Sequence, residues 1–181
     1  MRMQKTKFLS LITTSAVLLS TFIMGGKIAQ AQQRPVPLLR AKCVSSGLGT
    51  YREQNLDVSI GKAVYTSKFY LGAGNRSASL TCKIKPDNRP ESPFQTFNLG
   101  FGMRDNDATT PNVVVKVYLD GQQAESRTVI ATQPISLTLD VSNVSNVAIE
   151  AVCSRSNQYC DRVYFYKADL ERKIVSPQLK K

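Results

Sequence analysis

Residues 97–103 read FNLGFGM and residues 113–119 read VVVKVYL, and in both stretches every second side chain is apolar. Successive side chains of a β-strand point to opposite faces, so each stretch predicts a strand with one buried face. Asp120-Gly121 follows the second stretch directly, and this dipeptide is typical of a tight hairpin turn. These residues therefore predict antiparallel strands, one of which begins a hairpin.

The same alternation continues outward along the chain in both directions. It recurs, more strongly in the first two cases, at residues 135–141, 147–153, 58–65, 80–84, 125–130 and 163–170. Two polar connections, 86–93 and 105–111, separate strands. No segment keeps the 3.6-residue period of a helix. We therefore predict an all-β fold, a β-sandwich of two packed antiparallel sheets.

The beginning of the chain has the three zones of a secretory signal peptide. Three cations lie within residues 2–7, an apolar run covers residues 8–24, and Ala-Gln-Ala occupies residues 29–31. A membrane anchor is the competing interpretation, but Ser and Thr interrupt the apolar run, which is short for a membrane-spanning helix. We predict a cleaved leader at 1–31, a secreted, periplasmic or extracellular protein, and no membrane insertion of the mature chain.

Removal of these 31 residues from the 181 leaves 150, which is enough for one domain with its own core. Prolines at 35 and 37 predict an extended arm over residues 32–42, followed by the domain at 43–172 and a basic tail at 173–181. The formal charge of +11 includes four leader cations, so the mature chain carries +7. A basic surface is either merely solvated or suited to anionic envelope polymers.

Four cysteines lie in the mature part, at Cys43, Cys82, Cys153 and Cys160. Export favours disulfides, and four cysteines allow three pairings that sequence does not settle. The polar residues 154–159 form one loop, so we predict that Cys153 pairs with Cys160 and Cys43 with Cys82. A zinc site is the alternative, but the chain has no His and neither pair has Cys-x-x-Cys spacing.

Three stretches resemble a known family of secreted bacterial modules. They are FNLGFGMRDND at 97–107, VVVKVYLDG at 113–121 and PISLTLDV at 134–141. Their order is similar to that of the NPCBM family, the carbohydrate-binding module associated with family 98 glycoside hydrolases, and the resemblance covers about residues 57–170. It implies a galactose-binding-like jelly roll and a carbohydrate or polysaccharide as partner.

The sequence departs from the family pattern at three places near the expected ligand loops. Residues 68–74 lack the family's His, residues 160–166 lack its His and Trp, and the cysteine pair around residues 154–159 is additional. Fold therefore transfers to this chain more readily than binding specificity does.

Catalysis is not expected. The absence of His removes the usual general base and the common catalytic triads. Asp105 and Asp107 form the tightest acidic cluster, but two carboxylates in one loop do not by themselves flank a glycosidic bond. The resemblance implies that they could hold a structural calcium, with no other cofactor required. The alternative is that Asp105, Asn106 and Asp107 simply form a turn.

Sugar binding calls for aromatic faces with polar groups beside them. The candidates are Phe69, Tyr70 and Tyr159 as rings and Arg104, Asn106, Asn157 and Arg162 as hydrogen-bond donors. Tyr164 and Tyr166 are also available, although their spacing fits a strand that fills the core. We expect a site on loops at one end of the sandwich.

The sequence thus predicts a secreted, non-catalytic carbohydrate-binding module. The alternative is a structural or protein-interaction sandwich of the same fold that binds no sugar. Basic residues are scattered without the clustering and interleaved aromatics of a nucleic-acid binder, so no nucleic-acid partner is expected.

Overall fold

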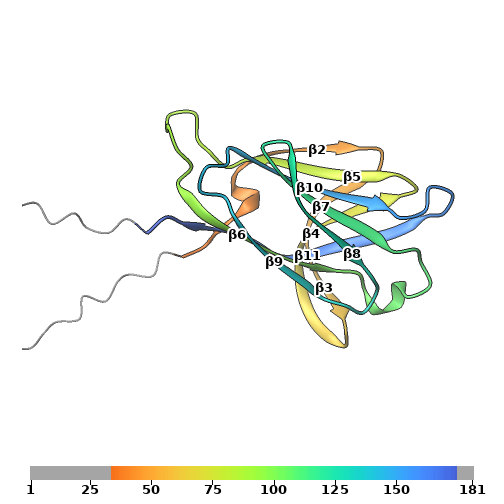
Figure 1. The fold of residues 1–181 in the computed structure, drawn as a ribbon. Helices are drawn as coiled ribbons and strands as arrows, with labels where there is room; N and C mark the ends of the chain where they lie inside the picture. Colours follow the sequence, from red (N-terminus) through yellow and green to blue (C-terminus); the bar gives the residue numbers. More distant parts are fainter. Residues whose placement is uncertain (1–33, 175–181) are drawn as a thin grey trace, which may run out of the picture. The chain divides into compact units, whose positions relative to one another are not determined.

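The computed structural model describes residues 34–174, so the predicted leader at 1–31 and most of the predicted tail lie outside the described residues. The described chain is all-β and forms two antiparallel sheets (Figure 1). The first sheet contains β3 (Thr50–Ile60), β4 (Ala63–Gly74), β11 (Cys160–Arg172), β6 (Phe94–Gly102) and β9 (Ile135–Asp140), in this spatial order. The second contains β2 (Lys42–Gly47), β5 (Ser77–Lys83), β10 (Asn146–Cys153), β7 (Val113–Leu119) and β8 (Gln122–Val129).

The two sheets pack face to face as a β-sandwich, which confirms the predicted fold class. Most connections cross from one sheet to the other, as in a jelly roll, and only the β3–β4 and β7–β8 hairpins stay within a sheet. Among the described residues no helix is long and apolar enough to cross a membrane.

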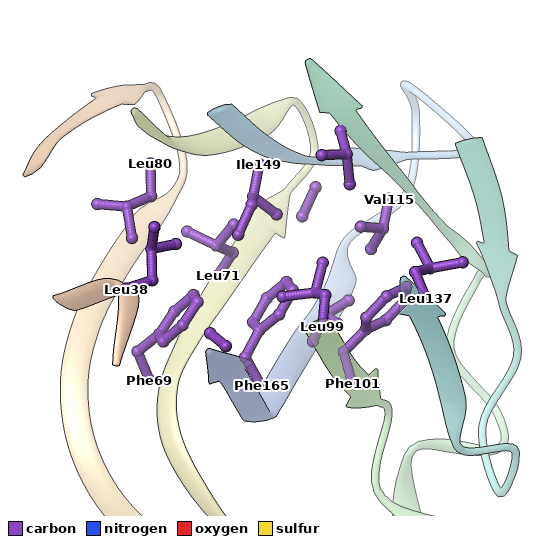
Figure 2. Close-up of a cluster of buried hydrophobic side chains, with 14 of the residues drawn as sticks. Leu38, Phe69, Leu71, Leu80, Leu99, Phe101, Val115, Leu137, Ile149 and Phe165 are labelled. Atoms are coloured by element: carbon purple, nitrogen blue, oxygen red, sulfur yellow. The ribbon is translucent and has the colours of Figure 1, made fainter. Parts of the chain in front are cut away.

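The core lies between the sheets and consists of the alternating apolar side chains (Figure 2). Phe165 on β11 is fully buried, stacks on Phe69 of β4 with ring centroids 4.6 Å apart, and lies 5.5 Å from the ring of Phe101 on β6. Val115 and Ile149 approach from the opposite sheet. The period-two pattern of the sequence therefore corresponds to one buried face on each sheet.

Two tight turns contain residues with positive φ and determine where strands end. Asp120 and Gly121 have φ of 46° and 84° and join β7 to β8, which confirms the predicted hairpin. The stretch 58–65, which the sequence suggested as one strand, is instead a hairpin. Gly61 and Lys62 have φ of 61° and 64° and turn the chain from β3 into β4.

The prediction of an arm at 32–42 that lies outside the domain is wrong for its described residues, because they pack as part of the domain. β1 (Val36–Pro37) pairs with β11, and the 3-10 turn η1 (Leu38–Arg40) inserts the fully buried Leu38 into the core. Burial of an apolar side chain offsets the entropy of ordering this segment.

Both predicted disulfides are confirmed. Cys43 and Cys82 are register partners on β2 and β5, and Cys153 and Cys160 close the connection between β10 and β11. All four cysteines are paired. The second bond fixes the ends of a loop whose residues 154–159 are all exposed.

Candidate functional site

The outer face of the first sheet carries a group of side chains that we call the arginine–tyrosine cluster. It consists of Tyr70 on β4, Arg162 and Tyr164 on β11, and Arg104, which follows β6. The Arg162 guanidinium lies 4.6 Å from the centroid of the Tyr70 ring, and the Arg104 guanidinium lies 5.3 Å from that of Tyr164. The two rings are 5.8 Å apart. Both contacts have cation–π geometry.

Register explains why these residues meet. Tyr164 is directly opposite Tyr70 on one side and Gly102 at the end of β6 on the other. Arg104 therefore enters the cluster from the β6–β7 connection, two residues beyond the sheet. Residues from three distant parts of the sequence are brought together at the end of the sandwich where the β10–β11 loop also lies.

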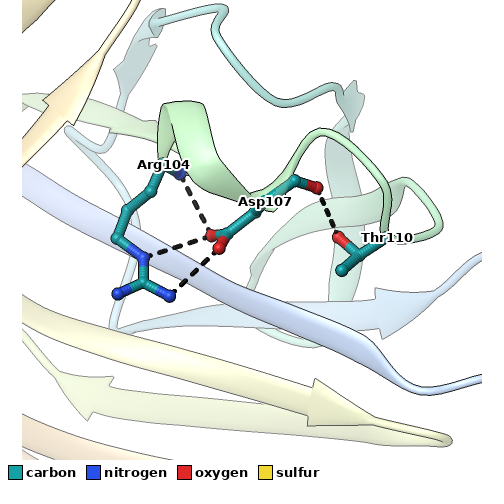
Figure 3. Close-up of polar contacts among 3 residues, drawn as sticks. All are labelled: Arg104, Asp107 and Thr110. Atoms are coloured by element: carbon teal, nitrogen blue, oxygen red, sulfur yellow. Dashed lines mark hydrogen bonds and ion pairs between the residues drawn. The ribbon is translucent and has the colours of Figure 1, made fainter.

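Asp107 holds Arg104 in place (Figure 3). Its side chain is only 3% exposed, and its carboxylate accepts hydrogen bonds from Nη2 of Arg104 at 3.0 Å and from Nε at 3.3 Å. This hydrogen bonding to the carboxylate raises the pKa of Arg104 above its ordinary value. Thr110 Oγ1 donates to the main-chain carbonyl of Asp107 at 2.8 Å and closes the short η2 turn (Asp105–Asp107). A bidentate pair of this kind fixes the plane of the guanidinium.

Asp161, which precedes Arg162 on β11, lies within range of the charges around the cluster. Burial, and then the charge of Asp107, raise its pKa above the ordinary value, while Arg104 and Arg162 oppose the rise. The Tyr164 hydroxyl is buried and has no hydrogen-bond partner among the described residues. The cluster therefore combines two cations with an unpaired hydroxyl, and the carboxyl groups of Asp107 and Asp161 act on its charges.

A hairpin arm, formed by residues 56–67 at the ends of β3 and β4, covers part of this face. β4 pairs with β11 only from Phe69 onward, so the arm leaves the sheet. A Cβ atom on Gly102 would lie 2.9 Å from Ile60 Cγ2, so the arm contacts the end of β6. Val58 and Ile60 are buried against Tyr70 and Tyr164. The arm thus encloses the apolar side of the arginine–tyrosine cluster.

Asp105 anchors the tip of the hairpin arm. One carboxylate oxygen accepts the Gly61 N–H at 2.7 Å, and the other accepts the Ser59 hydroxyl at 2.5 Å and the Lys62 N–H at 3.0 Å. These hydrogen bonds, led by that from Ser59, lower the pKa of Asp105 below its ordinary value. A charged carboxylate is the form that can accept all three.

We expect Asp105→Asn to lower the Tm of the protein at pH 7, because an amide offers one acceptor oxygen and turns donors toward the tip. The folded pKa of Asp105 is depressed, so its stabilisation is complete above the unfolded pKa of about 3.9 and is lost as pH falls through the folded pKa. The Tm difference between wild type and variant should therefore be constant above about pH 5 and shrink below about pH 4. Thermal unfolding across this range measures it.

Asn106→Ala is the matched control, since Asn106 lies in the same turn and is exposed. It should leave Tm unchanged at every pH. A difference for Asp105→Asn that did not vary with pH would contradict the anchoring role of the carboxylate.

The residues expected to hold calcium do not fit a calcium site in this arrangement. The oxygens of Asp105 accept from the hairpin arm and those of Asp107 accept from Arg104. Within residues 34–174 no group of three or more His, Cys, Asp or Glu side chains is placed to hold a metal ion. This arrangement therefore gives no support to a structural calcium, which stays an untested prediction from the family resemblance.

The predicted ligand residues other than Arg104 and Arg162 differ in how far they are exposed. Phe69 is fully buried in the core, so its assignment as a ligand residue is corrected: on β4 it points away from the outer face that carries Tyr70. Tyr70 is 6% exposed beneath Arg162. Tyr159 is 67% exposed, and Asn106 and Asn157 are also on the surface.

Tyr159 lies beside the arginine–tyrosine cluster. A Cβ atom on Gly74 would lie 3.7 Å from Cε2 of the Tyr159 ring, and Gly74 pairs with Cys160, two residues before Arg162. Arg104, Arg162 and Tyr70 thus belong to the cluster and Tyr159 lies next to it, while Phe69 lies in the core. The role of the cluster residues and Tyr159 in sugar binding stays a prediction. The sequence analysis did not identify Asp161. It also missed the anchoring role of Asp105, because only the bend of the hairpin arm brings Ser59 to Asp105.

No family model and no curated protein sequence matches the chain. Solved carbohydrate-binding modules, however, are similar to it in structure. A CBM51 module with INT domains of Clostridium perfringens ZmpB, in complex with GlcNAc, superposes with a TM-score of 0.61 at 15% identity, covering 78% of this chain and 32% of that one. This chain has the fold of carbohydrate-binding modules.

Two other CBM51 structures are also similar to this chain in fold. The module from C. perfringens GH95, in complex with methyl-galactose, has a TM-score of 0.57 at 12% identity and covers 76% of this chain and 99% of that one. The tandem modules of a family 98 glycoside hydrolase from Streptococcus pneumoniae have a TM-score of 0.53 at 13% identity and cover 77% and 50%. The chain spans about a third of the ZmpB chain, whose further parts it does not match.

Proposed function

We propose that this protein is a secreted, non-catalytic carbohydrate-binding module of the NPCBM type. The observation that carries the proposal is the convergence of Tyr159, Arg162 and Arg104 at one loop end of a carbohydrate-binding-module fold. Two disulfides suit a protein of an oxidising compartment. The family 98 association of one structural neighbour agrees with the NPCBM resemblance of the sequence.

The proposed ligand is a hexose unit of a glycan. The exposed ring of Tyr159 offers an apolar face for the C–H groups of a sugar, and Asn157 and Arg162 offer amide and guanidinium donors for its hydroxyls. The disulfide between Cys153 and Cys160 limits the entropy lost when the loop binds. Complexes of the structural neighbours with GlcNAc and methyl-galactose support this ligand class.

A second function is a structural or protein-interaction domain. It is favoured by the burial of Tyr70 and Tyr164, whose faces are covered by Arg162, Arg104 and the hairpin arm. Tyr159 is then the one large aromatic side chain that the described residues expose strongly at this end.

We expect Tyr159→Ala to weaken glycan binding by about 1 kcal/mol or more, roughly fivefold, because truncation removes an exposed aromatic anchor. Tyr159→Phe keeps the ring and should retain most of the affinity. A glycan array with the purified protein identifies the sugar, and titration calorimetry measures the affinity of each variant.

Both variants should leave Tm unchanged, since Tyr159 is outside the core. Repetition at high salt separates sugar recognition from charge attraction. If the unmutated protein bound no glycan on the array, the structural alternative would replace the proposal.

A further inference from the structure

A second surface lies at the end of the sandwich opposite to the arginine–tyrosine cluster, around the β5–β6 connection (Figure 1). Two hollows of about 410 and 460 Å³ flank this connection. We call their basic lining the basic groove; it comprises Arg40, Lys42, Lys83, Lys85, Arg89, Arg172 and Lys173. Arg162 and Arg172 lie near opposite ends of β11, so this groove is remote from the proposed sugar site.

The charge of the described domain is concentrated in the basic groove. Its lining contains seven basic side chains and two acidic ones, Asp87 and Glu91. The other described residues contain eleven basic and eleven acidic side chains, so they balance. Asp87 pairs with Lys83 and Glu91 with Lys173, and the other five cations form no ion pair with any described residue.

The lysines of the groove are held close together. Lys42 and Lys83 are direct register partners on β2 and β5, where like charges destabilise a sheet. The hydrogen bond from Lys83, followed by the charges of Lys83, Lys42 and Lys85, lowers the pKa of Asp87 below its ordinary value. Folding alone gives no reason to place these cations side by side, whereas an anionic ligand does.

The floor of the groove is apolar. Val36, Pro37 and Leu170 line the first hollow together with Phe94, over whose ring the Arg172 guanidinium lies at 5.6 Å. Arg172 lines the second hollow, and because its guanidinium lies over Phe94 of the first hollow, the two are neighbours. A sugar ring with a carboxylate substituent matches an apolar floor with a cationic rim. The one aromatic ring of the two hollows is 8% exposed, which gives nucleic-acid bases no stacking platform.

We propose that the basic groove binds an anionic polysaccharide, with carboxylates of successive sugar units placed against its lysine and arginine side chains. This site is independent of the proposed sugar site around Tyr159. A single molecule would then hold a hexose-bearing glycan at one end and an acidic polymer at the other.

Polygalacturonate and its fully methyl-esterified form test the proposal, because they share one backbone and differ in charge. At 50 mM salt we expect binding to the acid and not to the ester. The triple variant Lys42→Gln, Lys83→Gln, Lys85→Gln should lose about tenfold in affinity, since it removes three surface charge contacts. Lys62→Gln, Lys68→Gln, Lys167→Gln removes the same charge elsewhere on the exposed surface and should lose less than about threefold.

Two results would overturn the proposal. Equal losses in both triple variants would mean attraction by net charge alone, and equal groove-dependent binding of polyglutamate, DNA or anionic lipid vesicles would remove the preference for a glycan. Tyr159→Ala should leave polygalacturonate binding unchanged, so failure of the hexose site and failure of the basic groove are distinguished.

Discussion

Phe165→Ala should destabilise the protein by about 3–5 kcal/mol, the usual cost of removing a fully buried aromatic ring. The ring stacks on Phe69 and contacts Phe101, so its loss opens a cavity where β4, β11 and β6 meet. A domain of this size has about 5–15 kcal/mol of stability in total, so the variant loses a large part of it. Urea unfolding followed by far-UV circular dichroism measures the change, and Tm should fall by about 10 °C.

Tyr159→Ala is the control, because it also removes one ring but from a side chain that is 67% exposed. Its free energy of unfolding should change by no more than about 0.5 kcal/mol. Comparable losses in the two variants would mean that Phe165 does not lie at the centre of the core.

Replacement of Cys43 and Cys82 by alanine should destabilise the protein by about 4 kcal/mol. The bond closes a loop with a sequence separation of 39, and cross-links over longer loops restrict the unfolded chain more strongly. The corresponding Cys153/Cys160 variant should lose about 2.5 kcal/mol, because that separation is 7. Urea unfolding of both double variants beside the wild type gives the order.

Glycan binding is a second measurement that distinguishes the Cys153/Cys160 variant from the Cys43/Cys82 variant. Opening the β10–β11 loop should weaken glycan binding as well, since Tyr159 lies within it, whereas opening the β2–β5 bond should not. A larger stability loss for the shorter loop would contradict the chain-entropy argument.

The strands could be predicted where one face is buried along a regular pattern. Residues 97–102 of FNLGFGM and all of VVVKVYL lie in β6 and β7, as predicted. Asp120-Gly121 forms the predicted hairpin turn after β7. Prediction failed at residues 58–65, where apolar residues continue through a turn and onto the hairpin arm. It also failed at Leu38, whose burial depends on a docking site built by distant strands.

The candidate site was predicted in part. Arg104 and Tyr159 lie on loops and Arg162 lies near the beginning of β11, all at one end of the sandwich. The sequence did not show on which face of its strand each aromatic ring lies. Phe69 and Tyr70 are adjacent in the sequence, so strand geometry places Phe69 in the core and Tyr70 on the outer face. Period alone does not tell which of two alternating apolar faces meets the opposite sheet.

The sequence by itself determined the all-β class and the absence of a histidine-based site, because these depend on local periodicity and composition. The short spacing of Cys153 and Cys160 favoured the disulfide pairing, which the structure confirms. Only the tertiary structure decided how the hairpin arm folds over Tyr164, how Asp105 anchors it, and where the charges gather. Lys42 and Lys83 are far apart in the sequence and meet through the pairing of β2 with β5, and Arg89 and Arg172 line one hollow from distant parts of the chain. Such long-range juxtapositions depend on the sum of many weak burial and hydrogen-bond terms across the whole domain, which no single stretch of sequence contains.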